Sequence, residues 1–214
     1  MTADSSYQYF DDFRVDIYRM VPPDGSVIGV VGCGRAKTES RLVEEGREVH
    51  GVDISAEAVE VAKQRLTSAR VIEADDFNPF GPNSLDGLIL ADVIEHIPLA
   101  WIALKSYSQM VRPGGWIVIS VPNMRYVEAL ATFVVGGDWP EFPMGLFDRT
   151  HIQVMTHKRL IRWATAAGLE LEREFDRYDF RFIRRNIYRI MNIASFRLFK
   201  SFLNYQIQAR FRRM

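Results

Sequence analysis

The chain has 214 residues, 48% of them hydrophobic, and its 27 basic and 27 acidic side chains give a formal net charge of zero. This size and apolar content suit one core domain with an appendage. A single cysteine, Cys33, excludes an internal disulfide and a cysteine zinc cluster, and it indicates a reducing, cytoplasmic compartment. We expect neither a membrane span nor export, because no apolar run is long enough and residues 1–12 are polar and acidic.

The apolar run over residues 27–31 predicts the first buried strand, and Gly32-Cys33-Gly34 follows it directly. Two glycines at the end of a strand let the backbone turn tightly and approach a ligand closely. A dinucleotide fingerprint would need a third glycine at position 37, where the chain has Lys37. We therefore expect no pyrophosphate-binding loop.

A helix over residues 38–46 and a strand over residues 48–52 complete the first unit, which ends at Asp53, nineteen residues after Gly34. A carboxylate at the end of the second strand can accept hydrogen bonds from both hydroxyls of a ribose. The pattern predicts a nucleoside-binding βαβ unit. Capping of the next helix is the alternative role of Asp53.

The rest of the chain alternates helices and strands, which predicts an α/β fold with a doubly wound, Rossmann-like, mostly parallel sheet and helices on both faces. An irregular insert over residues 136–150 is expected to lie above the crevice at the carboxyl ends of the strands. The expected strands cover residues 69–73, 85–91, 116–121 and 169–175, and the expected helices cover residues 56–66, 99–111, 124–135 and 157–167.

The last part of the chain differs in charge, because residues 177–214 contain ten Lys or Arg and a single acid, Asp179. We therefore divide the chain into a sheet domain, residues 1–176, and a basic amphipathic helical tail, residues 177–214. Such a tail can lie on an anionic membrane surface. Packing of its apolar stripe in the core or in a dimer is the main alternative. Nucleic acid ranks last as a partner, because no RNA-binding motif accompanies the arginines.

Six short motifs follow one another along the chain: Gly32-Cys33-Gly34, Gly51-Val52-Asp53, Ala74-Asp75-Asp76-Phe77, Ala91-Asp92-Val93-Ile94-Glu95-His96-Ile97, Arg112-Pro113-Gly114-Gly115 and Val121-Pro122-Asn123. Through these motifs and their order the chain resembles class I S-adenosylmethionine-dependent methyltransferases over about residues 7–176. More narrowly, residues 121–125, 137–139 and 148–151 look like methyltransferases encoded beside or fused to glycosyltransferases in bacterial polysaccharide clusters.

The resemblance implies S-adenosylmethionine as the cofactor. It places the glycine loop against the methionine part and Asp75 on the adenine amino group, with Phe77 either near the ring or packed in the core. The implied cofactor-binding residues are Gly32, Cys33, Gly34, Asp53, Ile54, Asp75, Asp76, Phe77, Ala91 and Asp92.

Two positions depart from the family pattern. Val30 stands where the family usually has an acidic residue, two positions before the first glycine, and Ala36 replaces the third glycine of the loop. Alanine is small enough to keep the loop close to a ligand. The missing carboxylate predicts weaker cofactor binding. The alternative is a pseudo-enzyme, which binds the cofactor without catalysis and acts as a scaffold whose tail docks a glycosyltransferase or a membrane.

His96 and His151 are the candidate general bases, with Asp148 as a third candidate catalytic residue, because an imidazole that titrates near neutrality can take the proton of an acceptor hydroxyl. In an alternative, Asp92, Glu95, His96 and His151 together hold a divalent metal, as in RNA-end and quinone O-methyltransferases that resemble this motif. We rank the metal lower, because Asp92 reaches less far than the glutamate of those families. A purely capping or packing His96 is the remaining alternative.

These features predict an S-adenosylmethionine-dependent O-methyltransferase that acts on a hydroxyl. Our main expectation for the acceptor is a sugar of a surface glycan or of its lipid-linked precursor, and a quinone, a small metabolite or an RNA end is the alternative. We expect a cytoplasmic protein that is peripheral to the inner face of the membrane, with a homodimer as a further assembly.

Overall fold

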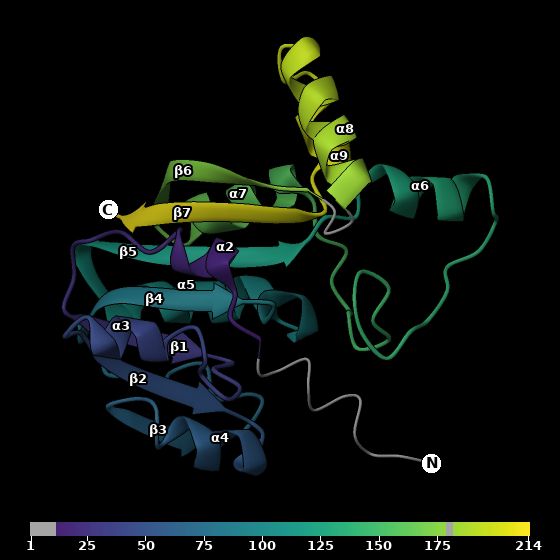
Figure 1. The fold of residues 1–214 in the computed structure, drawn as a ribbon. Helices are drawn as coiled ribbons and strands as arrows, with labels where there is room; N and C mark the ends of the chain where they lie inside the picture. Colours follow the sequence, from purple (N-terminus) through teal and green to yellow (C-terminus); the bar gives the residue numbers. More distant parts are fainter. Residues whose placement is uncertain (1–11, 179–181) are drawn as a thin grey trace.

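The computed structural model describes residues 12–178 and 182–214 and contains one seven-stranded sheet in the order β3-β2-β1-β4-β5-β7-β6 (Figure 1). The first five strands are parallel, whereas β7 is antiparallel to both of its neighbours. The predicted doubly wound, mostly parallel sheet is therefore confirmed. The strands are β1 (Val27–Val31), β2 (Glu48–Asp53), β3 (Ser68–Val71), β4 (Leu85–Ala91), β5 (Val111–Pro122), β6 (Leu169–Arg177) and β7 (Gln206–Arg213).

Helices cover both faces of the sheet, and the strands alternate their side chains between two hydrophobic cores. Leu88 and Leu90 of β4 belong to the core that includes α5 and α7, whereas Ile89 belongs to the core with α2, α3 and α4. Strands buried on both faces read as continuous apolar runs, which explains the sequence of β1 and β4. The helices are α2 (Val15–Tyr18), α3 (Ser40–Glu44), α4 (Ala56–Ala62), the 3-10 helix η2 (Ile94–His96), α5 (Ala100–Met110), α6 (Val127–Val134), α7 (His157–Ala166), α8 (Phe182–Ala194) and α9 (Lys200–Leu203).

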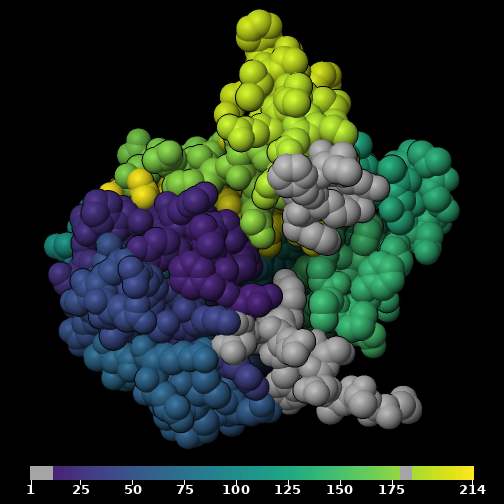
Figure 2. All heavy atoms as spheres, in the orientation of Figure 1, coloured from purple at the N-terminus to yellow at the C-terminus, as the bar shows by residue number. Residues whose placement is uncertain are grey.

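The predicted boundary after residue 176 is wrong, because β7 lies inside the sheet between β5 and β6. Ile207, Ala209 and Phe211 of this strand alternate into the core. Arg210 and Arg212 alternate with the apolar residues and pair with Glu172 on the other face. Because these charges interrupt the apolar pattern, the strand was not recognised from the sequence. Only α8 and α9 form the predicted helical part, and they project away from the sheet (Figures 1 and 2).

Within residues 12–178 and 182–214, no helix has the length and hydrophobicity that a bilayer crossing requires.

Trp116 of β5 packs over Gly87, the residue that pairs with it on β4. The indole is fully buried, and its Nε1 donates a hydrogen bond to Asp24 O at 2.9 Å. A Cβ atom on Gly87 would lie 2.1 Å from Trp116 Cζ2. Glycine is therefore required at position 87 because the indole occupies the space of a side chain.

We expect Gly87→Ala to lower the free energy of unfolding by about 1–3 kcal/mol, because the added methyl group overpacks a fully buried ring. Urea unfolding measures the loss. Gly81→Ala is the control, because its added Cβ would meet nothing closer than 3.9 Å. Equal stability of the two variants would contradict the role of Trp116.

Candidate active site

The loop after β1 is fixed to the end of β2 by backbone hydrogen bonds. The amides of Gly32 and Cys33 donate to Val52 O at 2.9 and 3.1 Å. Gly32 has φ +69°, and a Cβ atom there would lie 2.6 Å from Val93 Cγ2. Both the left-handed backbone and the close contact require glycine at position 32. Burial raises the pKa of the Cys33 thiol, so this side chain stays a neutral part of the loop.

Asp53 holds the loop from the end of β2. Its Oδ2 accepts a hydrogen bond from Gly34 N at 2.7 Å, and its Oδ1 accepts one from Ser55 N at 2.9 Å. Ser55, rather than Asp53, caps α4, because Ser55 Oγ accepts from Ala58 N. The alternative role of Asp53 as the helix cap is therefore wrong. Each carboxylate oxygen keeps a further acceptor site for a ribose hydroxyl.

The other predicted cofactor residues lie along the same edge of the sheet. Ile54 is exposed directly after β2, and Ala91 and Asp92 lie at the end of β4. Asp75 is exposed, and Phe77 packs edge-on against Tyr107 with ring centroids 6.3 Å apart. Asp76 accepts a hydrogen bond from the backbone of Asn78. Phe77 thus packs against the core through its contact with Tyr107, as one of its two expected roles requires. The cofactor contacts of all these residues stay predictions.

Arg14 is a site residue that the sequence did not reveal. Its Nη1 lies 2.6 Å from Asp92 Oδ2, and its Nε and Nη2 donate to Asp16. Gln206 of β7 joins the network, since its Nε2 donates to Asp92 Oδ1 at 2.7 Å. Burial acts to raise the pKa of Asp16, but the hydrogen bonds and the positive charge of Arg14 outweigh it and lower that pKa to about 2. No local sequence pattern connects residues so far apart.

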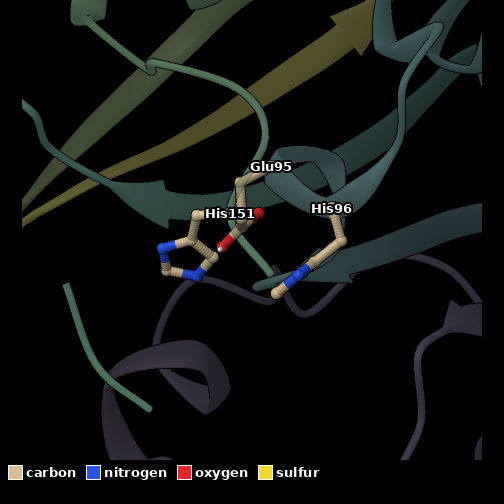
Figure 3. Close-up of side chains that lie close together, drawn as sticks. All are labelled: Glu95, His96 and His151. Atoms are coloured by element: carbon tan, nitrogen blue, oxygen red, sulfur yellow. Dashed lines mark ion pairs between the residues drawn. The ribbon is translucent and has the colours of Figure 1, made fainter. Parts of the chain in front are cut away.

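The structure brings His96 and His151 together, with ring centroids 4.8 Å apart (Figure 3). His96 lies on η2, after β4, and His151 directly follows the insert, before α7. The residues after the insert are fixed because the amides of Ile152 and Gln153 both donate to Glu95 O at 3.0 Å. Only the metal alternative required these two distant histidines to lie together, and their chemical roles stay predictions.

Both imidazoles use Nδ1 for a backbone carbonyl. His96 Nδ1 lies 3.1 Å from Thr150 O, and His151 Nδ1 lies 3.2 Å from Leu146 O. Because a carbonyl accepts only from a protonated nitrogen, Nδ1 carries the hydrogen and Nε2 keeps its lone pair in the neutral form. His151 Nε2 lies 4.0 Å from Glu95 Oε1.

Glu95 is fully buried, and neither of its carboxylate oxygens has a hydrogen-bond partner within the described part of the chain. Burial, reinforced by the charge of Asp92, raises the pKa of Glu95 well above its ordinary value. Burial also lowers the pKa of His151, and the neighbouring His96 adds to this effect. Burial therefore favours the neutral form of both the Glu95 carboxyl group and the His151 imidazole.

Asp148 acts through Thr150. Its Oδ1 accepts hydrogen bonds from Thr150 N at 2.8 Å and from Thr150 Oγ1 at 2.6 Å. Thr150 Oγ1 in turn lies 3.0 Å from His96 Nδ1. Burial acts to raise the pKa of Asp148, but the hydrogen bonds from Thr150 outweigh it and lower that pKa. The geometry makes Asp148 a residue that positions His96, and its catalytic role stays a prediction.

Three of the four predicted metal ligands lie together. One ligand atom each from Glu95, His96 and His151 lies within 4.8 Å of the other two. Asp92 is directed elsewhere, because its two oxygens bind Arg14 and Gln206. The expectation of a four-residue ligand set is therefore corrected to three residues. An unpartnered buried carboxylate beside two imidazoles is a donor set that fits a divalent cation.

The glycine loop, the acidic end of β2 and the histidine pair share one edge of the sheet, and this arrangement matches a known family. The family model described as "Methyltransferase domain" matches residues 17–174. The chain belongs to this methyltransferase family. The methyltransferase is 28% identical over 159 residues to the ubiquinone biosynthesis O-methyltransferase of Thiobacillus denitrificans, covering 71% of this chain and 67% of that protein. It is 25% identical over 155 residues to the protein of the same name in Leptothrix cholodnii, covering 69% of this chain and 66% of that protein.

Among solved structures, the methyltransferase superposes on a SAM-dependent methyltransferase from Archaeoglobus fulgidus with a TM-score of 0.60 at 18% identity. The superposition covers 97% of this chain and 90% of that one, and it shows a shared fold. The family and fold confirm the expectation of an S-adenosylmethionine-dependent methyltransferase. The narrower link to glycosyltransferase clusters stays untested.

We expect Asp53→Asn to weaken binding of S-adenosylhomocysteine by about 10–100-fold. The amide keeps an acceptor oxygen but loses the charge-assisted bonds to the ribose, each worth about 1.5–3 kcal/mol. Isothermal titration calorimetry measures the affinity. Glu57→Gln, which changes an exposed carboxylate on α4, is the matched control. Unchanged affinity in Asp53→Asn would remove the ribose assignment.

We also expect Glu95→Gln to remove a pH dependence of stability. A carboxyl group with a raised native pKa keeps a proton that the unfolded chain releases above about 4.5. The free energy of unfolding of the chelator-treated native protein therefore falls by up to about 1.4 kcal/mol per pH unit from there up to the raised pKa. Urea unfolding across this pH range measures it, with exposed Glu60→Gln as the control. A slope that persists in Glu95→Gln would rule out this origin.

Proposed function

We propose that this protein transfers the methyl group of S-adenosylmethionine to a hydroxyl of an aromatic, quinone-type acceptor. The observation that carries the proposal is the pair of imidazoles, each with Nδ1 at a backbone carbonyl, beside the unpartnered carboxyl of Glu95. The names of the two curated relatives support a quinone acceptor. They favour our alternative expectation over the sugar acceptor.

The residues present fit the cofactor. Arg14 and Asp92 offer a cation and an anion 2.6 Å apart at the end of β4. Such a pair complements the carboxylate and ammonium groups of a methionine moiety. Val30, at the position where the family usually has a carboxylate, is buried in the core behind the loop. Asp92 would then supply the negative charge for the ammonium group in its place. S-adenosylmethionine itself brings a methyl group already activated by its sulfonium.

The protein's own groups would align the acceptor and take its proton. His151 suits the role of base, because its lowered pKa leaves Nε2 unprotonated at neutral pH. Thr150 and Asp148 hold His96 beside it. In the second arrangement, Glu95, His96 and His151 would bind a divalent cation, which would act as a Lewis acid on the acceptor oxygen. Because burial favours the protonated form of Glu95, a cation bound by its carboxylate would displace a proton.

Aromatic side chains of the insert and α6 support an aromatic acceptor. Trp139 lies edge-on to Phe147 with ring centroids 4.9 Å apart, and Phe133 and Phe142 extend the cluster at 5.9 and 6.4 Å. The same insert supplies Leu146 O to His151. Aromatic rings bind other rings through stacked or edge-on contacts. The segment that positions the base is thus also rich in groups that suit a ring.

We expect His151→Ala to lower the turnover of a catechol acceptor by about 100-fold or more, because a positioned base contributes about 10²–10⁴. Binding of S-adenosylhomocysteine should not change. His50→Ala, a histidine on β2 bonded to Ser68, is the control. Methyl transfer is followed by mass spectrometry with catechol and, in parallel, with a free sugar.

A chelator separates the two roles of the histidines. Loss of activity on chelation and recovery with Mg²⁺ or Mn²⁺ would identify ligands, whereas insensitivity to chelation would identify a base. Full activity of the His96→Ala/His151→Ala variant would refute both roles. Methylation of the sugar but not of catechol would refute the proposed acceptor.

A further inference from the structure

Helices α8 and α9 form a hairpin, residues 182–203, and many of its described apolar side chains are exposed to solvent. Ile190 and Ile193 of α8 are 65% and 66% exposed, and Phe196 and Leu198 in the connecting turn are 91% and 79% exposed. Further exposed apolar residues are Ile187, Met191 and Phe199. Core packing therefore applies to Leu203, which is 3% exposed, and not to these residues, and packing in a dimer stays the alternative for them. Such a concentration of exposed apolar groups indicates an interaction surface.

The inward face of α8 is the more polar one. Asn192 is only 1% exposed, and its Nδ2 donates to Tyr178 Oη at 2.8 Å. One turn earlier, Tyr188 lies edge-on to Tyr126 and donates to Glu128 Oε1 at 3.3 Å. These contacts fix the rotation of the helix. The exposure of its isoleucines is therefore built into the fold.

The turn between the two helices presents its side chains at the end of the hairpin. Phe196 and Arg197 have φ values of +51° and +66°, a left-handed backbone that side chains other than glycine rarely adopt. Arg197 Nη2 holds the turn to Asp176 at 3.0 Å. Strained backbone of this kind persists where the surrounding structure enforces it, and it is concentrated at functional sites.

The charge of the hairpin has one sign. Its sequence contains five basic residues and no acid, and the basic residues are Arg184, Arg185, Arg189, Arg197 and Lys200. Arg185 and Arg189 are exposed on α8 beside the apolar residues. A helix with arginines next to exposed apolar side chains suits a surface that has both phosphate groups and hydrocarbon.

We propose that the α8–α9 hairpin docks this protein onto an anionic lipid bilayer, with Phe196, Leu198 and Phe199 inserted below the headgroups and the arginines against lipid phosphates. The hairpin projects from the body of the molecule (Figure 2). A narrow projection suits insertion into a fluid interface better than the broad, flat contact of a second copy. The proposal does not depend on the identity of the methyl acceptor.

Docking would also place the candidate active site near the membrane. Tyr188 of α8 packs against a small core formed by Met124, Tyr126, Ala129 and Leu146. Leu146 belongs to the insert and accepts the hydrogen bond of His151 Nδ1. The hairpin is thus joined through one hydrophobic cluster to the segment that positions the histidine.

Co-sedimentation of the full chain with vesicles tests the proposal, using phosphatidylcholine alone and phosphatidylcholine with one-third phosphatidylglycerol. We expect binding to the anionic vesicles, and a roughly tenfold or greater loss in Phe196→Ser/Leu198→Ser/Phe199→Ser, because apolar burial is removed. Arg185→Gln/Arg189→Gln should reduce the dependence on phosphatidylglycerol. Binding should weaken from 0.1 M to 1 M salt, as the screening length falls from about 10 Å to about 3 Å.

The control is Ile102→Ser/Leu171→Ser, which removes two exposed apolar side chains outside the hairpin and should bind as the unmodified protein does. Thermal unfolding and S-adenosylhomocysteine binding verify that each variant is folded. No vesicle binding by the unmodified protein, or equal binding by the triple variant, would overturn the proposal. So would a dimer in sedimentation velocity that the triple variant abolishes while vesicles are ignored.

Discussion

One ion-pair network joins the two ends of the described chain to the middle of the sheet. Asp92, at the end of β4, is bound by Arg14 from the segment before α2 and by Gln206 from the start of β7. Asp16 and Gln208 extend the network across the same pair of elements. Partly buried charges of this kind are stabilising only when every partner is present. The position of the last strand, the position of the segment before α2 and the orientation of Asp92 therefore depend on one another.

The local chemistry of the sequence accounts for the elements that begin and end within short stretches. The β1 run, the glycine loop and Asp53 lie within one unit, and each was predicted where the structure has it, because strand burial and glycine turns are local properties. The proximity of His96 and His151 was implied only by the metal alternative, which came from a family motif rather than from physics. Its physical cause is a tertiary contact, in which the amides of Ile152 and Gln153 donate to Glu95 O.

Two features could not be found in this way. The alternation of Ile207, Ala209 and Phe211 was hidden by arginines that are paired across the sheet, so that a strand read as part of a basic helix. The role of Arg14 depends on Asp92, 78 residues further along the chain. Charged residues obscure hydrophobic periodicity when their partners lie on another strand, and the sequence alone does not show the partner.

The position of β7 has a consequence for how the protein is made. Within the sheet, β6 has no neighbour other than β7, and β7 separates it from β5. During synthesis, β5 therefore remains an open, apolar sheet edge until residues 206–213 have left the ribosome. Unpaired edges of this kind attract other strands. The edge of the fifth strand is thus open to wrong pairing in the interval between its own synthesis and that of the seventh strand.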